Sequence, residues 1–157
     1  MNDTLIEHTA RFVGVLCIGL VSGIALCVFL AERVWVGGAR FYTELMQMLN
    51  RALTVPTTGL AAMGMVAMVT DAAMLFKRGA GAPLWLAVIA VLFNVTALAL
   101  TKFGHFPIND QMLKWDPANP PADWMRIKAR WTTLHVGRTF CGVSSFALFT
   151  LSNSCGG

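Results

Sequence analysis

The chain has few charged residues for its length. Of its 157 residues, 13% are charged and 56% are hydrophobic, so it is far more apolar than an ordinary soluble domain. It also lacks the polar breaks that divide the apolar runs of a soluble core, because four windows approach or exceed the length that crosses roughly 30 Å of hydrocarbon. The sequence therefore predicts one polytopic membrane domain over residues 1–157.

The chain also lacks a Cys-x-x-Cys motif, although it has four cysteines. Cys17 and Cys27 fall in the first apolar run, and Cys141 and Cys155 in the last. On one helix, Cys17 and Cys27 would lie about 15 Å apart at a rise of 1.5 Å per residue, which no disulfide spans. The sequence thus argues against membrane quinone reductases that need a vicinal redox pair, and it predicts core thiols.

The sequence also predicts no secretory signal peptide. The N-terminus, MNDTLIEHTAR, is too acidic for one, and no Ala-x-Ala cleavage site precedes Glu32. We therefore expect a retained first span over residues 12–31. Within it, Gly19 and Gly23 form a GxxxG motif, which lets another helix approach closely, either inside this chain or across a dimer.

The positive charge of the chain does not form a separate basic domain. The formal net charge is +4, with the basic residues beside apolar spans, so lipid head groups are the expected neighbours and nucleic acid is not. The two longer connections, 32–53 and 103–130, together with their flanks hold eight Lys or Arg residues against three at the other side. The positive-inside rule places these connections in the cytoplasm of a bacterial cell with the protein in the inner membrane.

Four spans are predicted, at 12–31, 54–76, 83–102 and 131–151, the last in a helix that begins near Pro121. Residues 41–53 are amphipathic and predict a helix lying at the membrane interface, where Trp35 and Tyr42 suit the head-group region. A short amphipathic connector is expected before the fourth span. The fold class is therefore all-α, a polytopic membrane four-helix bundle.

Asp71 is the one carboxylate well inside a predicted span. Such a residue is costly in hydrocarbon and is a functional candidate by default. Lys77 and Arg78 follow within two helical turns, so Asp71 either pairs or snorkels near the interface, or takes part in a proton relay.

Polar and aromatic side chains concentrate in the last third of the chain. At 100° per residue, one face of the predicted fourth helix carries Trp124, Lys128, Trp131, His135, Arg138, Gly142 and Ser145. Indoles, an imidazole and a guanidinium above small residues suit an aromatic or quinone-like ligand with oxygen substituents. A homo-oligomer or a partner protein remains an alternative use of the helices.

Each of these polar residues has a second interpretation. Arg138 either binds a ligand or is a structural anchor paired with an acid on its side of the membrane, for which the candidates are Glu32, Glu44 and Asp110. His135 is a general base, a metal ligand or a packed neutral side chain. A metal site of His105, His135 and Asp110 is disfavoured, since no ligand pair has helical spacing, and we expect no metal.

The preceding segment adds Asn109. In Pro107-Ile108-Asn109-Asp110 it either caps a short helix or binds a ligand. Trp115 and Trp124 are either interface anchors or, for Trp124, a residue that stacks on the ligand.

These residues carry a resemblance to a known family. Thr101, Pro107-Ile108-Asn109, Leu113, Asp123-Trp124, Arg130-Trp131, His135 and Arg138 resemble the pattern T…PxN…L…W…RW…H/N…R of the anthrone oxygenase-like integral membrane family. That family is four-helical, and many bacterial members were catalogued as a domain of unknown function. The matching segment covers about 50 residues.

The resemblance implies an oxidation without a cofactor, in which O₂ converts an anthrone-type phenolic compound to a quinone. It implies that His135 removes a proton, Arg138 stabilises the oxyanion, Asn109 binds a substrate oxygen, and Trp131 stacks on the ring. The alternative is a non-catalytic membrane subunit or scaffold, which docks a partner through the first span and the 41–53 helix.

Overall fold

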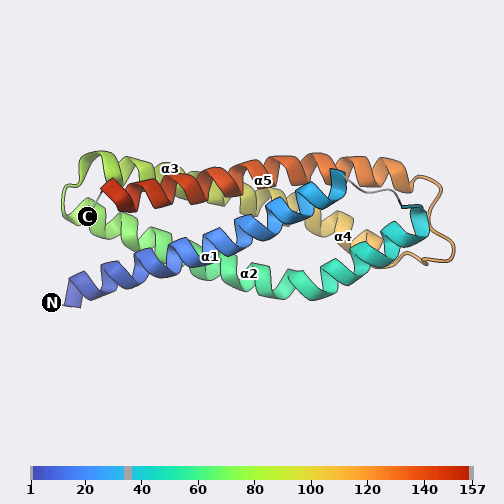
Figure 1. Ribbon diagram of the computed structural model, residues 1–157, viewed down its shortest axis with the longest axis horizontal. Coiled ribbons are helices and arrows are strands. Elements are labelled where there is room, and N and C mark those ends of the chain that lie inside the picture. The colour runs from blue at the N-terminus through green and yellow to red at the C-terminus, as the bar shows by residue number, and fades with distance from the viewer. Residues whose placement is uncertain (1, 34–36, 156–157) are drawn as a thin grey trace.

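The computed structural model describes residues 2–33 and 37–155, which form helices and short connections with no strand among them. Figure 1 shows the elements: α1 (Asn2–Arg33), α2 (Ala39–Lys77), α3 (Gly81–Ala99), the π-helical η1 (Leu100–His105), α4 (Phe106–Met112) and α5 (Trp124–Cys155). The predicted all-α class is confirmed.

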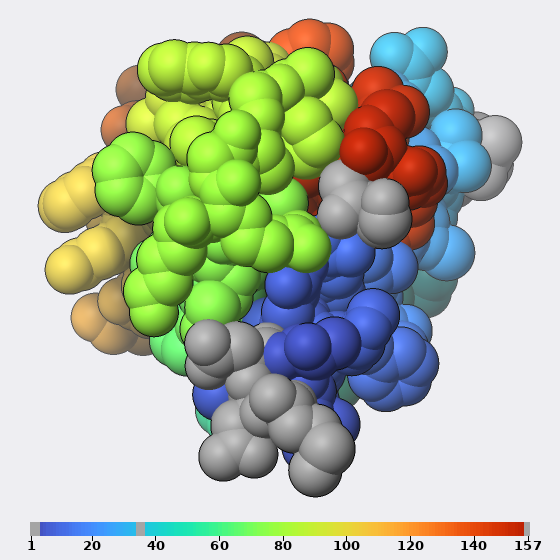
Figure 2. Space-filling view, turned by 90° about the vertical axis from the view of Figure 1, so that its left-hand side faces the viewer, coloured from blue at the N-terminus to red at the C-terminus, as the bar shows by residue number. Residues whose placement is uncertain are grey.

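The four long helices lie side by side in a bundle. α5 packs against both α1 and α3, and α2 closes the ring by packing against α1 and, less extensively, α3. The start of α1, the α2–α3 turn and the end of α5 lie at one end of the bundle, and the start of α2 and the α4–α5 connection lie at the other (Figure 1). Seen from the first end, the start of α1, the α2–α3 turn and the end of α5 gather on one face (Figure 2).

Three helical stretches are long and apolar enough to cross a membrane, Thr4–Arg33, Ala39–Lys77 and Gly81–Met112. Large apolar side chains such as Phe12, Val55 and Phe76 are exposed on their outer faces, as expected of surfaces that meet lipid. α5 is not among these stretches. Its inward face carries many polar groups, and these lower its apolar content.

Residues 41–53, predicted as a separate interfacial helix, are instead the first part of α2, which is continuous for 39 residues. Pro56 lies inside the helix. A proline has no backbone N–H to donate to the helical hydrogen bonds, so a helix bends there, and Figure 1 shows α2 bent around its middle. The hydroxyl of Thr57 donates to the Leu53 carbonyl over 2.6 Å. The helix therefore passes through the proline without a break.

Phe41 and Met48 on the outer side of this first part are 56% and 58% exposed, as expected of side chains that meet lipid, whereas Tyr42 and Met46 are buried in the core. Tyr42, which we expected among the head groups, packs against Trp124 with ring centroids 5.6 Å apart. Trp35 lies outside the described residues.

The third helix extends beyond its predicted end at Lys102. α3 continues through η1 into α4, so the connector before α5 is helical over its first part and buries Ile108 and Met112. Asn109 therefore lies inside α4 and does not cap it. α5 begins at Trp124, a little after the predicted start, and the Asp123 carbonyl accepts its first-turn hydrogen bonds.

Asp71 is fully buried and ion-paired, but with a partner on another helix. Its Oδ1 accepts a hydrogen bond from Arg11 Nε in α1 over 3.1 Å, while Lys77 and Arg78 were the expected partners. Glu7 forms ion pairs with both Arg11 and Arg78. This paired-charge cluster, Glu7, Arg11, Asp71 and Arg78, fastens the start of α1 to the end of α2.

Candidate functional site

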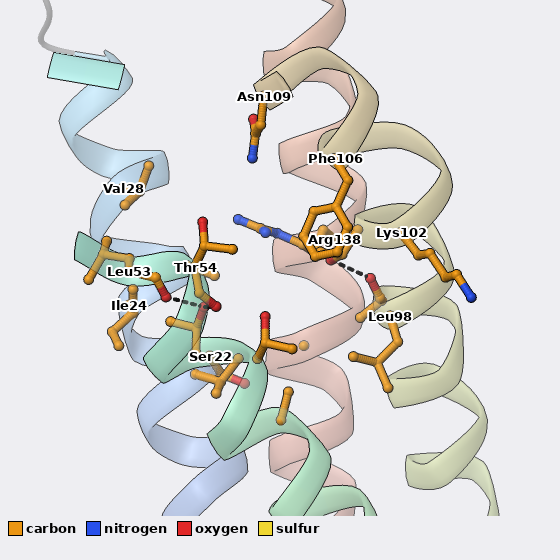
Figure 3. A pocket seen from close by; sticks show the side chains of 18 of the residues that line it. Ser22, Ile24, Val28, Leu53, Thr54, Leu98, Lys102, Phe106, Asn109 and Arg138 are labelled. Atoms are coloured by element: carbon orange, nitrogen blue, oxygen red, sulfur yellow. Dashed lines mark hydrogen bonds between the residues drawn. The ribbon is translucent and has the colours of Figure 1, made fainter. Parts of the chain in front are cut away.

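A cavity of about 390 Å³ lies between α1, α2, the α3–α4 segment and α5. Its volume is within the range of small-molecule sites, and most of its lining is apolar, as on α1 with Ile18, Val21 and Ile24. Figure 3 shows the side chains that line it, with Asn109 at one end and Ser22 at the other. A site with this lining can enclose an apolar ligand and contact a few of its polar atoms.

Arg138 of α5 supplies the cationic group of the cavity. Its guanidinium extends into the space between Asn109 and Thr54, whereas Lys102 at the rim extends away (Figure 3). Its Nη2 donates to His135 Nδ1 over 2.9 Å, and its buried Nε has no hydrogen-bond partner. A guanidinium in an apolar cavity favours a ligand that brings an oxygen atom or a negative charge.

No acid pairs with Arg138 among residues 2–33 and 37–155, so the predicted structural anchor is not found. Two of the three acids considered for it have other partners, and the third is exposed. Glu32 accepts from the Thr132 hydroxyl over 2.8 Å, Glu44 pairs with Arg40 over 3.0 Å, and Asp110 is exposed on α4.

His135 lies behind Arg138 and does not line the cavity. The ring is fully buried, and its Nε2–H donates to the Ala25 carbonyl over 3.0 Å, because a carbonyl can only accept. Nδ1 is then the acceptor for Arg138. The ring also stacks on Trp131, with centroids 4.7 Å apart and planes at 18°. Both nitrogens and one face of His135 are thus occupied.

Trp131 and Asn109 meet at one end of the cavity, and both line it. Trp131 Nε1–H donates to Asn109 Oδ1 over 2.9 Å, which fixes the orientation of the amide. The amide nitrogen of Asn109 then points toward the Arg138 guanidinium (Figure 3). Two sets of N–H donors, from α4 and α5, converge on the same part of the cavity.

The π-helical turn shapes this wall. The Phe106 N–H donates to the Thr101 carbonyl, five residues back, and both residues line the cavity. The Thr101 hydroxyl is used within the helix, where it donates to the Ala97 carbonyl over 2.8 Å. Such turns occur often at functional sites, since the wider turn changes which side chains face inward.

His105, at the end of η1, completes an aromatic cluster with Trp131 and His135. Its ring meets Trp131 edge-on at 5.3 Å and His135 at 6.0 Å between centroids. Asp110, the third member of the disfavoured metal site, is exposed. In the described part of the chain, no three His, Cys, Asp or Glu residues are grouped to hold a metal ion.

Trp124 was proposed to stack on the ligand, but it lies outside the cavity. It packs against Tyr42 at the α4–α5 end, beside the buried Trp115. Conversely, the cavity includes Ser22 and Asn94, which the residue pattern did not single out as ligands. Their only signal was polarity within apolar spans.

The profile of the family described as anthrone oxygenase matches residues 4–148. This chain therefore belongs to the anthrone oxygenase family, and Asn109, Trp131, His135 and Arg138 all fall within the matched region. No curated protein and no solved structure matches the chain.

Proposed function

We propose that this member of the anthrone oxygenase family is a membrane-embedded, cofactor-independent oxygenase that converts an anthrone-type phenolic compound to a quinone. The observation that carries the proposal is the guanidinium of Arg138, which extends into an apolar cavity beside the Asn109 amide with no carboxylate partner among the described residues. These N–H groups are placed to bind an oxyanion.

The chemistry follows from stabilising such an anion. An anthrone has a CH₂ group opposite a ring carbonyl, and loss of one proton places negative charge on that oxygen. Donors fixed in an apolar cavity stabilise this enolate far more than water does. The electron-rich carbon then reacts with O₂, gaining one oxygen atom as a carbonyl and losing both hydrogens. The second oxygen atom leaves with them as water, so O₂ is reduced as the carbon is oxidised.

In this proposal His135 positions Arg138 and does not remove the proton. Its only lone pair, on Nδ1, already accepts from Arg138. The family pattern also admits asparagine at this position, and asparagine can accept a hydrogen bond but cannot serve as a base. Among the described residues, no carboxylate or imidazole lines the cavity. The proton therefore leaves to solvent, because hydrogen bonds from Arg138 and Asn109 lower the pKa of the bound substrate.

We also propose that α5 crosses the membrane as a fourth span. Two of its serines find partners inside the bundle, as Ser145 donates to the Ala90 carbonyl over 2.8 Å and Ser152 to the Pro83 carbonyl over 2.7 Å. Phe140 and Leu151 on its outer face are exposed. Internal satisfaction of polar groups is what a bilayer requires of a helix. With the longer connections cytoplasmic, the positive-inside rule would be obeyed.

Oxygen uptake by the protein in lipid nanodiscs tests the activity, with 1,8-dihydroxyanthrone as substrate and empty nanodiscs as the background. We expect uptake together with formation of 1,8-dihydroxyanthraquinone. Arg138→Gln should lower the rate about 100- to 1000-fold, the usual cost of losing an oxyanion donor. Arg130→Gln, at an exposed position on the same helix, should leave the rate unchanged. Uptake no faster than in empty nanodiscs would refute the proposal.

The GxxxG motif supports the scaffold alternative only through one of its two glycines. A Cβ on Gly19 would lie 2.9 Å from the Phe146 ring, so this glycine is already used within the chain, while Gly23 faces open space. Gly23→Leu therefore separates the two functions. Loss of a co-purifying complex with unchanged oxygen uptake would support a docking role for α1.

A further inference from the structure

The end of the cavity opposite Asn109 is also polar. Ser22 of α1 and Asn94 of α3 both line the cavity, and they are only 4% and 5% exposed. The Ser22 hydroxyl oxygen is buried without a hydrogen-bond partner. Asn94 Nδ2 contacts Met68 Sδ at 3.6 Å, and a thioether is a weak acceptor. Both side chains thus have hydrogen-bonding capacity left for a ligand.

The helix register places these two residues at the same depth. The hydrogen bonds from Ser145 to Ala90 and from Ser152 to Pro83 set the antiparallel register of α3 and α5, which puts Asn94 level with residues 141–142. Gly142 in turn faces Ser22, because a Cβ built on it would lie 3.4 Å from the Ser22 hydroxyl oxygen. Ser22 and Asn94 therefore flank α5 about one helical turn beyond Arg138.

Buried polar groups without good partners cost free energy, so natural proteins keep few of them. Alanine and leucine would fill these positions in an ordinary apolar helix contact. We propose that Ser22 and Asn94 form a second polar subsite, which binds a hydroxyl or carbonyl oxygen at the far end of the substrate. The inference rests on the proposed function, since both ends belong to one cavity.

The two ends select different chemistry. Arg138 and Asn109 offer N–H donors and a positive charge, which suit an oxyanion. A serine hydroxyl and a carboxamide each donate and accept, so they suit a neutral hydroxyl or carbonyl. The cavity therefore prefers a planar aromatic compound with oxygen functions at opposite ends, and it binds that compound in one orientation.

Equilibrium binding of two unreactive quinones to the protein in nanodiscs tests this preference. We compare 2-hydroxyanthraquinone with 2,6-dihydroxyanthraquinone, which has an additional hydroxyl at the opposite end. The native protein should bind the dihydroxy compound about tenfold more tightly, the effect of one well-placed hydrogen bond. Ser22→Ala combined with Asn94→Leu should abolish the preference while keeping the affinity for the monohydroxy compound within about twofold.

Ser145→Ala is the matched control, because the Ser145 hydroxyl is buried but donates to the Ala90 carbonyl, and it should keep the preference. Equal binding of both quinones by the native protein, or a preference that persists in the double variant, would overturn the subsite. If oxygen uptake is normal in either case, the proposed function still holds. If neither quinone binds and no uptake occurs, both proposals fail.

Discussion

Arg11 and Arg138 both lie largely inside the bundle, yet their surroundings differ. Arg11 is ion-paired with Glu7 and with the fully buried Asp71, and its side chain is 12% exposed. Arg138 donates to the neutral acceptor Nδ1 of His135 and keeps an unpartnered Nε beside a cavity. A buried cation with two carboxylates is already neutralised, whereas one with only an imidazole beside it is not.

This difference distinguishes a structural ion pair from a ligand-binding site. A buried ion pair holds helices in register, and removing one partner leaves an uncompensated charge. A cation without an acid retains its capacity to bind an anion, at a cost to the stability of the empty protein. The paired-charge cluster joins the start of α1 to the end of α2, which lie at one end of the bundle (Figure 1), whereas Arg138 extends into the cavity (Figure 3).

The same substitution at the two arginines should change the free energy of unfolding differently. Arg11→Met leaves the buried Asp71 without its α1 partner and should lower the free energy of unfolding by about 3 to 5 kcal/mol. Arg138→Met removes a poorly compensated charge and should leave stability unchanged or higher. Chemical unfolding in detergent micelles, followed by circular dichroism, measures both. Equal destabilisation by the two variants would erase the distinction.

A carboxylate placed beside Arg138 should neutralise its charge, as Glu7 and Asp71 neutralise the charge of Arg11. Asn109→Asp keeps an acceptor for Trp131 Nε1 but puts a negative charge next to the guanidinium. We expect the affinity for 2-hydroxyanthraquinone to fall about 10- to 100-fold. Arg138 would pair with the new carboxylate and no longer bind the ligand, and the second carboxylate oxygen would repel the ligand oxygen. Ligand titration in nanodiscs measures this affinity.

Asn119→Asp makes the same charge change at an exposed position in the α4–α5 connection. Its affinity for the quinone should match that of the native protein. If both variants weaken binding equally, the effect comes from net charge and not from pairing with Arg138.

The sequence predicted these two regions unequally. A helical rotation of about 100° per residue predicted which side chains share one face of α5. The structure confirms that Trp131, His135 and Arg138 on this face point to the interior. The sequence did not predict the partner of Asp71. Arg11 lies 60 residues away in sequence, and only the packing of α1 on α2 brings Arg11 and Asp71 together. Local spacing favoured Lys77 and Arg78, whereas the hydrogen bond to Asp71 comes from Arg11.

Three other features could not be predicted from residue patterns. The sequence predicted a helix over residues 41–53 and a separate span from residue 54, yet α2 continues through Pro56, although a proline costs a helix interior about 3 kcal/mol. Asn109 resembled a helix cap by its Pro-x-Asn context, but the π-helical turn joins α3 to α4 and places it within a helix. Ser22 resembled an ordinary packing residue because serine is common at helix contacts in membranes.

His135 is the residue that makes Arg138 different from Arg11, so replacing it tests what an imidazole contributes. His135→Leu should lower the affinity for 2-hydroxyanthraquinone about tenfold, because Arg138 loses the acceptor that orients it. His135→Asn retains an acceptor near Nδ1 and should lie within about threefold of the native affinity and oxygen-uptake rate. Loss of uptake in His135→Asn with binding intact would instead identify His135 as the base.

The smallest expected effect lies one step further from the guanidinium, at Trp131. Trp131→Phe keeps an aromatic ring against His135 but removes the Nε1–H that holds Asn109 Oδ1 at 2.9 Å. The amide can then rotate and present its oxygen to the cavity for part of the time, so we expect about a threefold loss of affinity for 2-hydroxyanthraquinone. Unfolding by denaturant should change little. Combining it with Asn109→Ala should add nothing further, because the tryptophan acts on the ligand through that amide, and an additive loss would show that Trp131 itself contacts the ring.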